Sequence, residues 1–296
     1  MLTVIVKSYS IPVLRTQPCA GFFFVLGLSF CVGFNSYPTL PFNDTLLDFI
    51  NNPCNRYKML QYRYLVGTEI VLNGTEKKLK KRLKRMIIAI GSQKGGCGKS
   101  TIAVNIATAL AHKKLDVVIV DADRQGTTAN WAMDRTNHPT LPVVHCLQKY
   151  ENIKDTLIDL SSRYEHVIVD AAGRDSRELR TGMIAADLLI VPFRPSQPDL
   201  DTLPNLQEII TQATDLNPKL KVVGLITLAP TNPIINEIAE AQEYLLDYPE
   251  IELLDVIIKD RKVYRDAISE GLGVIELANP KATEEITKLV EYIYHG

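Results

Sequence analysis

The chain has 296 residues, with 33 Lys and Arg against 34 Asp and Glu, 46% hydrophobic residues and 23% charged residues. This composition excludes collagen-like, wholly disordered and multi-span membrane proteins, and it suits one or two globular domains. The near-neutral total hides an asymmetry, because residues 1–85 carry a net charge of +8 and residues 86–296 a net charge of −9. The five cysteines form no CxxC pair, which argues against a zinc module or a disulfide scaffold.

Residues 1–85 show no alternation of strands and helices and no motif of known chemistry, so we expect a poorly structured N-terminal extension. Its apolar stretch at residues 19–34 is shorter than the roughly 20 residues that a membrane-spanning helix needs. Residues 77–85 include seven basic residues, a run that suits anionic lipid, nucleic acid or a solvated helix. Three interpretations stay open: native translation starts at Met86, the segment anchors the protein to a membrane, or it is a dispensable or partner-binding extension.

From Met86 onward, short β-branched runs alternate with segments of helical length. We predict strands at residues 87–90, 116–121, 143–146, 166–170, 187–193, 221–228 and 252–258. We predict helices near residues 99–113, 126–135, 151–162, 200–215, 234–247, 261–270 and 282–294. Apolar strands separated by helices are typical of a parallel sheet buried on both faces. The sequence therefore predicts one α/β domain at residues 86–296, with a doubly wound, mostly parallel sheet and helices on both faces.

The densest chemistry follows the first of these strands, in the segment SQKGGCGKST at residues 92–101, here called the phosphate loop. Its glycines let the backbone curl so that successive N–H groups point at phosphate oxygens, and the following helix adds its N-terminal partial positive charge. Lys99 then suits the β- and γ-phosphates of a nucleotide, and the Ser100 hydroxyl suits Mg²⁺. The predicted cofactor-binding residues of the loop are Gly95, Gly96, Cys97, Gly98, Lys99, Ser100 and Thr101.

The phosphate loop departs from the usual G-x-x-x-x-G-K-[ST] pattern, because Gln93 replaces the first glycine and Lys94 precedes the glycine pair. It resembles the deviant Walker A motif, K-G-G-x-x-K-[ST], of the ParA/MinD family of dimerising ATPases. The resemblance covers residues 86–296 and implies a P-loop NTPase fold, ATP and Mg²⁺ as cofactors, hydrolysis of ATP to ADP and phosphate, and a homodimer in the ATP state. In that family the extra lysine reaches the nucleotide of the partner subunit, which implies this role for Lys94, while Lys99 acts within its own subunit.

Three carboxylates lie at the carboxyl ends of predicted strands, Asp121 and Asp123 in DVVIVDADRQ and Asp170 in HVIVDAAGRD. The carboxyl ends of strands are where ligands of open α/β sheets gather. By resemblance to the family, Asp123 positions the attacking water, Asp121 supports the metal site and Asp170 holds Mg²⁺ through water. Arg124 stands where the family usually has proline, so the geometry of this loop stays open.

The segment LIVPFRPSQPDLDTL, residues 189–203, resembles the proline-rich region of the small ParA-type proteins, often called ParF-like. Prolines stiffen a chain and remove N–H donors, so we expect a rigid exposed arm. The resemblance places Pro195 against the nucleotide. Thr227 and Pro230, at the end of a late strand, are candidates for contact with adenine.

A basic cluster near the C-terminus is a candidate site for sequence-independent DNA binding. The acidic charge of residues 86–296 does not attract DNA as a whole, so only a local patch provides the contact. A solvated basic patch is the alternative interpretation. The cluster consists of Lys259, Arg261, Lys262 and Arg265.

These features favour a cytoplasmic, nucleoid-associated ATPase for plasmid or chromosome partition, working with a centromere-binding partner of the ParB or ParG type. A membrane-localised positioning ATPase like MinD is an alternative, but a membrane-binding C-terminal helix needs a basic amphipathic pattern. The C-terminal segment instead carries a stripe with core-like spacing at Ile286, Leu289, Val290 and Ile293. Bacterial tyrosine kinases are a third class, matched superficially by Tyr292 and Tyr294 but not by Lys94. A nitrogenase-reductase-like electron carrier is weaker still, because Cys97 lies in the phosphate loop itself.

Overall fold

The computed structural model describes residues 4–5, 71–72, 85–232 and 237–295, and it divides the chain into two compact units, Met1–Lys81 and Arg82–Gly296. In the first unit, β1 (Val4–Ile5) and β2 (Val71–Leu72) form an antiparallel pair. The apolar stretch at residues 19–34 and the basic run up to residue 84 lie outside the described residues. Within the described part, no helix is long and apolar enough to cross a membrane.

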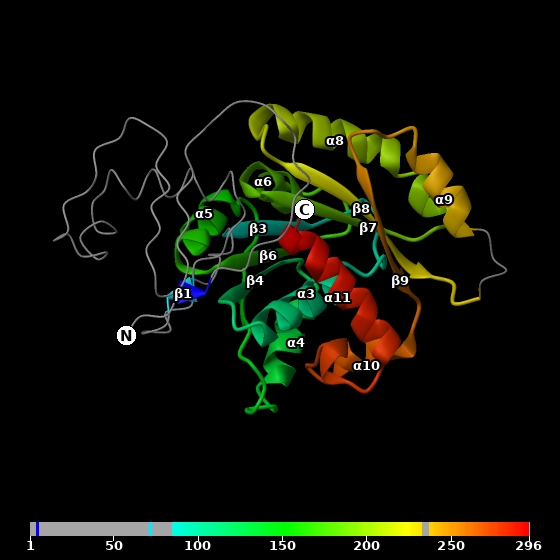
Figure 1. Cartoon of the computed structure of the whole chain (residues 1–296). Coiled ribbons are helices and arrows are strands. Elements are labelled where there is room, and N and C mark those ends of the chain that lie inside the picture. Colours follow the sequence, from blue (N-terminus) through cyan, green and yellow to red (C-terminus); the bar gives the residue numbers. More distant parts are fainter. Residues whose placement is uncertain (1–3, 6–70, 73–84, 233–236, 296) are drawn as a thin grey trace, which may run out of the picture. The chain divides into compact units, whose positions relative to one another are not determined.

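The second unit is built on a seven-stranded sheet in which all neighbouring strands are parallel (Figure 1). The strands are β3 (Met86–Ile90), β4 (Val117–Ala122), β5 (His145–Gln148), β6 (His166–Ala171), β7 (Leu188–Phe193), β8 (Lys221–Ala229) and β9 (Glu252–Lys259). Their order across the sheet is β5-β4-β6-β3-β7-β8-β9. Every residue of β4, β6 and β7 is buried, because helices cover both faces of these central strands.

Helices pack against both faces of the sheet, which confirms the doubly wound α/β fold (Figure 1). One face is covered by α3 (Lys99–His112), α4 (Thr127–Arg135), α10 (Lys262–Ser269), the short turn η1 (Val274–Glu276) and α11 (Pro280–His295). The opposite face is covered by α5 (Lys154–Arg163), α6 (Arg177–Ala185), α8 (Leu203–Leu216) and α9 (Glu237–Leu245). The predicted stripe of α11 is buried at Ile286, Leu289, Val290 and Ile293.

Two local expectations need correction. The third predicted strand lies two residues later than expected, because β5 is an edge strand whose half-exposed residues give a weak pattern. The segment after β7 is not a wholly exposed arm: it forms a short helix, α7 (Gln197–Leu200), with Pro195 and Leu200 buried. Pro198 occupies the first turn of this helix, where its missing N–H costs no hydrogen bond.

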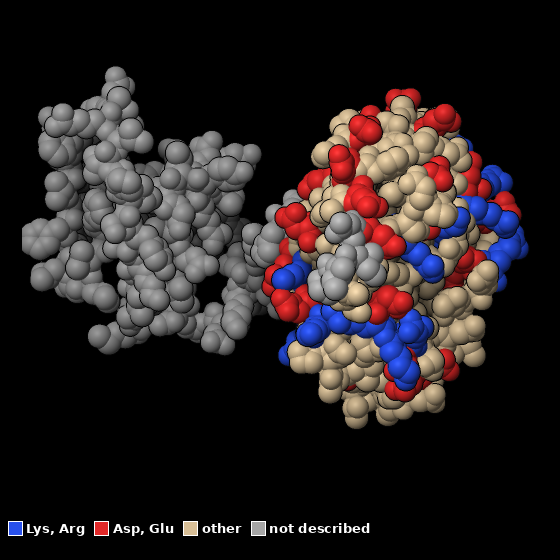
Figure 2. Space-filling view, turned by 90° about the vertical axis from the view of Figure 1, so that its right-hand side faces the viewer, with Lys and Arg blue, Asp and Glu red and all other residues tan. Residues whose placement is uncertain are grey.

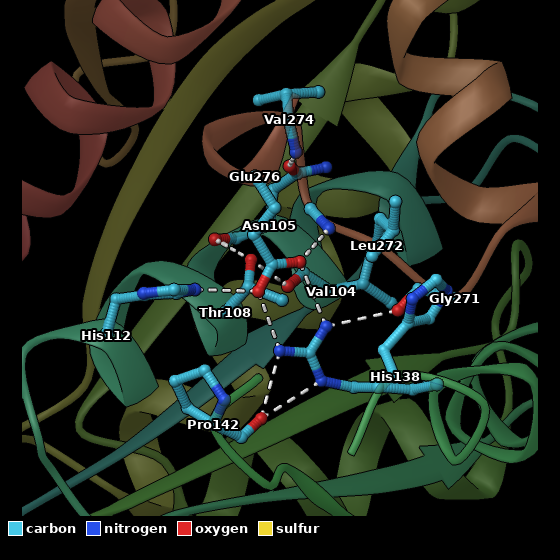
Figure 3. Close-up of polar contacts among 12 residues, drawn as sticks. Val104, Asn105, Thr108, His112, His138, Pro142, Gly271, Leu272, Val274 and Glu276 are labelled. Atoms are coloured by element: carbon cyan, nitrogen blue, oxygen red, sulfur yellow. Dashed lines mark hydrogen bonds and ion pairs between the residues drawn. The ribbon is translucent and has the colours of Figure 1, made fainter. Parts of the chain in front are cut away.

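A buried ion pair joins α4 to η1 beneath one face of the sheet. The Arg135 guanidinium donates to both carboxylate oxygens of Glu276, at 2.7 and 3.0 Å, and also to the carbonyl oxygens of Gly271 and Pro142. Glu276 in turn accepts a hydrogen bond from the His112 ring at 2.7 Å (Figure 3). Because both side chains are buried, loss of Arg135 leaves the Glu276 charge with weaker compensation, from the His112 ring and the Gly273 N–H.

We therefore expect Arg135→Met to lower the free energy of unfolding by about 3–5 kcal/mol, measured by urea denaturation of the full chain. Arg163→Met is the matched control, because the Arg163 side chain is 68% exposed and its ion pair within the described residues is with Asp159 of the same helix. The control variant should stay within about 0.5 kcal/mol of wild type. Equal stability of the two variants would show that the buried pair does not hold α4 to η1.

His166 begins β6 and is 3% exposed, and neither of its ring nitrogens has a hydrogen-bond partner among the described residues. Burial lowers its pKa, against a smaller opposing effect of the Glu165 charge. The folded protein therefore keeps the ring neutral, whereas the unfolded chain takes up a proton below about pH 6.5. The free energy of unfolding is therefore unaffected by His166 above that pH. It falls as the pH drops, because protonation then favours the unfolded chain.

The expected result is that stability lost between pH 7.5 and pH 5 is smaller in a His166→Phe variant than in wild type. Urea unfolding of both proteins across this range measures the difference. A parallel pH dependence in the two proteins would contradict the assignment of this loss to His166.

Candidate functional site

The loops that leave the central strands surround a cleft at the carboxyl edge of the sheet. β3 lies between β6 and β7, and the chain crosses first to β4 on one side and later to β7 on the other. Such a change of direction opens a crevice where ligands bind in doubly wound sheets. The cleft has a volume of about 830 Å³. It is lined by the phosphate loop, by the ends of β4 and β8, by the loops after β4, β6, β7 and β9, and by residues of α4, α6 and α10.

The phosphate loop leads into α3 without a side-chain cap. Gly98 stands at the N-cap position with φ of 88°, a left-handed conformation that favours glycine, and no side chain accepts a hydrogen bond from the first turn. The N–H groups of that turn, at Lys99, Ser100 and Thr101, have no partner within the helix. These residues line the cleft, so unpaired donors and the positive end of the helix dipole meet at an anion-binding position.

The two lysines of the phosphate loop lie in different surroundings. Lys99 is 7% exposed, and its Nζ donates to the carbonyl oxygen of Lys94 at 3.0 Å. The same carbonyl accepts from Ser92 Oγ at 2.9 Å and from Cys97 Sγ at 3.4 Å, so it organises the loop. The Lys94 side chain is exposed, and no hydrogen bond or ion pair joins it to the described residues. One lysine therefore lies inside the cradle and the other projects from it.

Gly173, in the loop after β6, approaches the phosphate loop very closely. A Cβ atom at this position would lie 2.7 Å from Lys99 Nζ, 2.8 Å from the Lys94 carbonyl oxygen and 2.9 Å from Gly95 Cα. Glycine is therefore required by space at this position. The contact couples the loop after β6 to the side chain that the sequence predicts to hold phosphate.

Asp170, at the end of β6, is 1% exposed, and its Oδ2 accepts a hydrogen bond from the Thr128 hydroxyl. Its other oxygen, Oδ1, has no hydrogen-bond partner among the described residues. Burial raises the pKa of Asp170 to about 6, against the opposing effects of the nearby Thr128 and Ser100 hydroxyls and of the Lys99 charge. A buried carboxylate with an unused oxygen beside a hydroxyl suits Mg²⁺, which prefers oxygen ligands and keeps several waters.

Asp121 is the register partner of Asp170 on the neighbouring strand, and it is fully buried. Its two oxygens accept hydrogen bonds from the N–H groups of Asp123, at 3.1 Å, and Ala129, at 2.8 Å. Burial raises its pKa, and these backbone bonds oppose the shift. Both oxygens thus brace the loop after β4, and Asp121 lies beside the carboxylate at the predicted metal position.

Asp123 lines the cleft and shapes the loop after β4. Its Oδ1 accepts from the Gln125 N–H at 3.0 Å, and its carbonyl oxygen accepts from the Gly126 N–H at 3.0 Å. Arg124 therefore does not prevent a turn at the position where the family usually has proline. The Arg124 side chain lies over the Tyr150 ring, 5.1 Å from its centroid, and pairs with Glu151.

The cleft is basic although the unit that contains it is acidic. Its lining includes five basic residues and three acidic ones, within residues 86–296 that carry a net charge of −9. Positive charges that line a cleft raise the local concentration of an anionic ligand there. The lining basic residues are Lys99, Arg124, Arg174, Arg194 and Arg265.

Sequence reasoning did not assign Thr128 and Arg194 to the site, whereas it placed Arg174 among three arginines that suit contact with phosphate, a partner protein or solvent. Thr128 lies in α4 without a motif, and only the parallel pairing of β4 with β6 places it beside Asp170. Arg194 lies beside Pro195, the residue that the resemblance selected, yet Arg194 lines the cleft whereas Pro195 is buried and is not among the lining residues. Strand order is the information that would have selected these residues, because loops that follow adjacent parallel strands meet at the carboxyl edge of the sheet.

Two other candidate residues lie behind the loop rather than in the cleft. Cys97 is fully buried, and its carbonyl oxygen accepts a hydrogen bond from Thr227 Oγ1 at 2.7 Å. Thr227 is itself buried and ties β8 to the phosphate loop, and neither residue lines the cleft. The Pro230 carbonyl oxygen accepts from Lys259 Nζ at 3.1 Å. Contact of Thr227 or Pro230 with adenine stays a prediction.

The residues of the predicted basic cluster lie around the start of α10, but carboxylates lie against most of them. Arg261 pairs with Glu285 at 2.7 Å in half-buried surroundings. The remaining pairs are exposed and join Lys262 to Asp266 and Arg265 to Asp260. Figure 2 shows a band of basic side chains across the lower middle of the face that it draws, with acidic side chains at its borders.

We expect Asp170→Asn to be more stable than wild type at pH 8 when Mg²⁺ and nucleotide are absent. The pKa of Asp170 is raised to about 6 in the folded state. Wild type therefore has its full folding stability below about pH 4, where the carboxyl is neutral, and loses stability as the pH rises through about 6 and the buried group ionises. A shift of two pH units corresponds to about 3 kcal/mol at pH 8, which should shrink towards zero at pH 4. Urea unfolding at both pH values measures this gap, and a gap independent of pH would refute the electrostatic explanation.

Comparisons with known proteins agree with this geometry. Residues 88–274 match the family model described as the CobQ/CobB/MinD/ParA nucleotide binding domain. Proteins named "Maintenance of carboxysome distribution protein A" are 28% identical over 213 residues in Halothiobacillus neapolitanus, covering 71% of this chain and 97% of the relative, and 31% identical over 199 residues in Gloeobacter kilaueensis, covering 67% and 88%.

A putative plasmid partition protein from Borrelia burgdorferi, solved with bound AMPPNP, has the same fold. Its TM-score is 0.56 at 19% sequence identity, and the alignment covers 71% of this chain and 98% of the Borrelia chain. The fold comparison and the family match agree with the resemblance of the phosphate loop to the deviant Walker A motif. This chain therefore belongs to the CobQ/CobB/MinD/ParA family of nucleotide-binding domains.

Proposed function

We propose that this protein is an ATP-hydrolysing partition ATPase. ATP and Mg²⁺ bind in the cleft, two copies dimerise around the nucleotides, and the dimer binds DNA without sequence preference. A centromere-binding partner of the ParB or ParG type then stimulates hydrolysis and drives segregation of a plasmid or chromosome in the nucleoid region of the cytoplasm. The observation that carries this proposal is the opposite placement of two lysines, with Lys99 buried in the cradle and Lys94 projecting from it.

The first step is capture of the phosphate chain by the start of α3. Unpaired N–H groups of its first turn hold phosphate oxygens, and Lys99 Nζ exchanges the Lys94 carbonyl for a phosphate. Asp170 and the Ser100 hydroxyl would hold Mg²⁺, which supplies charge neutralisation and orientation when bound. Because Asp170 is deeply buried, its interaction with a cation is screened weakly.

Hydrolysis requires a group that orients water against the terminal phosphate. Asp123 lines the cleft, and its Oδ1 is fixed by the Gln125 N–H, so the carboxylate has a defined direction. Phosphoryl transfer needs little covalent participation by the protein, so orientation and electrostatic stabilisation are sufficient. The exposed Lys94 side chain is available to a second subunit, which provides a physical reason for dimerisation when nucleotide is present.

Non-specific DNA contact is proposed at the exposed part of the basic cluster. Lys259 is bonded to a carbonyl oxygen and Arg261 lies in a half-buried pair, whereas Lys262 and Arg265 are 82% and 64% exposed. Exposed ion pairs contribute little stability, so these two side chains can exchange their carboxylates for DNA phosphates at small cost.

The cargo has a second candidate. The relatives named for maintenance of carboxysome distribution favour positioning of a protein compartment, by the same cycle of dimerisation and DNA release. A membrane cargo like that of MinD is disfavoured, because the apolar stripe of α11 is buried against the sheet and not available to lipid. Co-purification of the full chain with a DNA-binding partner or with a compartment shell protein separates the two cargo classes.

We expect Lys94→Ala to bind ATP but to lose ATP-dependent dimerisation, and Asp123→Ala to dimerise but to release phosphate at least about 100-fold more slowly than wild type. Sedimentation velocity and phosphate release with and without DNA measure these effects. Lys113→Ala is the matched control, because Lys113 is exposed just beyond the opposite end of α3. Wild-type dimerisation and turnover in both site variants would defeat the proposal.

A further inference from the structure

Four arginines line the cleft, and their pairing distinguishes them. Arg124 pairs with Glu151 at 3.2 Å and Arg265 with Asp260 at 2.6 Å, so carboxylates offset both charges. Arg174 and Arg194 have no carboxylate partner in the part of the chain that the structure describes. The cleft therefore contains cationic groups that no anion of the described residues balances.

Arg194 is the member of this pair that the structure directs at the phosphate loop. Its Nε and Nη2 both lie against the Gly96 carbonyl oxygen, at 3.2 and 2.5 Å. A Cβ atom at Gly96 would lie 3.4 Å from Nη2, so the guanidinium closes the side of the cradle. A neutral carbonyl is a weaker acceptor for an arginine than an anionic oxygen.

Strand order and a buried carboxylate fix the position of the Arg194 backbone beside the phosphate loop. β7 pairs with β3 directly, so the chain leaving β7 emerges beside the phosphate loop. The Arg194 N–H donates to Asp199 Oδ1 at 3.3 Å, and the Arg194 carbonyl oxygen accepts from the Ser196 N–H at 2.8 Å. Asp199 is 5% exposed, which fixes the backbone while the exposed guanidinium keeps freedom to move.

We propose that Arg194 is a phosphate-binding residue that rests on the Gly96 carbonyl oxygen without ligand and transfers to a phosphate oxygen of a bound nucleotide. This inference rests on the nucleotide-binding function proposed above. The planar guanidinium offers parallel N–H donors that match phosphate oxygens, and the transfer replaces a neutral acceptor by a charged one. It also links occupancy of the cradle to the segment that continues into α7.

A purely structural role for Arg194 predicts different behaviour. An exposed side chain whose partner is one neutral carbonyl adds little to stability, so its removal should leave the ligand-free fold intact. A phosphate-binding role predicts loss of nucleotide affinity without loss of ligand-free stability. Charge retention by lysine should restore part of the affinity, because lysine provides a point charge without the bidentate geometry.

The test measures binding of a non-hydrolysable ATP analogue with Mg²⁺ to the full chain by calorimetry, together with the ligand-free thermal midpoint. We expect Arg194→Gln to weaken binding about 10- to 100-fold, and Arg194→Lys to weaken it less. The ligand-free midpoint should change by less than about 2 °C. Arg163→Gln, an exposed arginine of α5 outside the cleft, should bind as wild type does.

Binding by Arg194→Gln within about twofold of wild type would overturn the inference. So would a fall in the ligand-free midpoint that accounts for the weaker binding. Lys99→Ala separates this failure from failure of the proposed function. If wild type does not bind the analogue, or if Lys99→Ala binds it equally well, the nucleotide-binding proposal and the inference that rests on it both fail.

Discussion

The site depends on one local constraint: α3 begins at the carboxyl edge of the sheet with its first N–H groups unpaired. Gly98 permits this start because its left-handed backbone turns the chain directly from the phosphate loop into the helix. A side-chain cap would satisfy those donors and fill the position of an anion. Gly173 packs over the same loop, so the cradle is closed from a second side by backbone alone.

Electrostatic balance follows from that arrangement. The cradle concentrates donors and basic side chains, while Asp121 and Asp170 lie buried at neighbouring positions beneath it. Both oxygens of Asp121 accept hydrogen bonds from backbone N–H groups, whereas Oδ1 of Asp170 has no hydrogen-bond partner among the described residues. The ligand-free site thus combines an excess of exposed positive charge with a buried carboxylate that a cation would satisfy. A Mg²⁺–nucleotide complex complements both features.

Much of the fold follows from sequence because its signals are local. Buried parallel strands are apolar along most of their length, and the glycines of the phosphate loop identify the turn into α3. The displaced edge strand β5 lacked such a signal, because half-exposed residues follow no strict pattern. The helix α7 was missed because the prolines were interpreted as stiffening an exposed arm, although Pro198 occupies a position in the first turn that tolerates proline.

The site could be predicted only in part, because charge pairing depends on tertiary structure. Lys99 and Asp170 belong to motifs, and sequence spacing is enough to select them. Sequence does not reveal that Glu285 lies against Arg261, or that Arg194 reaches Gly96 from the end of a neighbouring strand. The net charge of −9 likewise describes the surface as a whole and gives no indication of the basic cleft within it.

The most direct measurement is the affinity of the full chain for a non-hydrolysable ATP analogue, with Mg²⁺ and with a chelator, at pH 6 and pH 8. Asp170 is ionised at pH 8 and partly protonated at pH 6, because its pKa is about 6. We therefore expect Mg²⁺ to strengthen binding of the analogue at both pH values, and more strongly at pH 8. Absence of binding, or binding that the chelator leaves unchanged, would contradict a Mg²⁺–nucleotide site in this cleft.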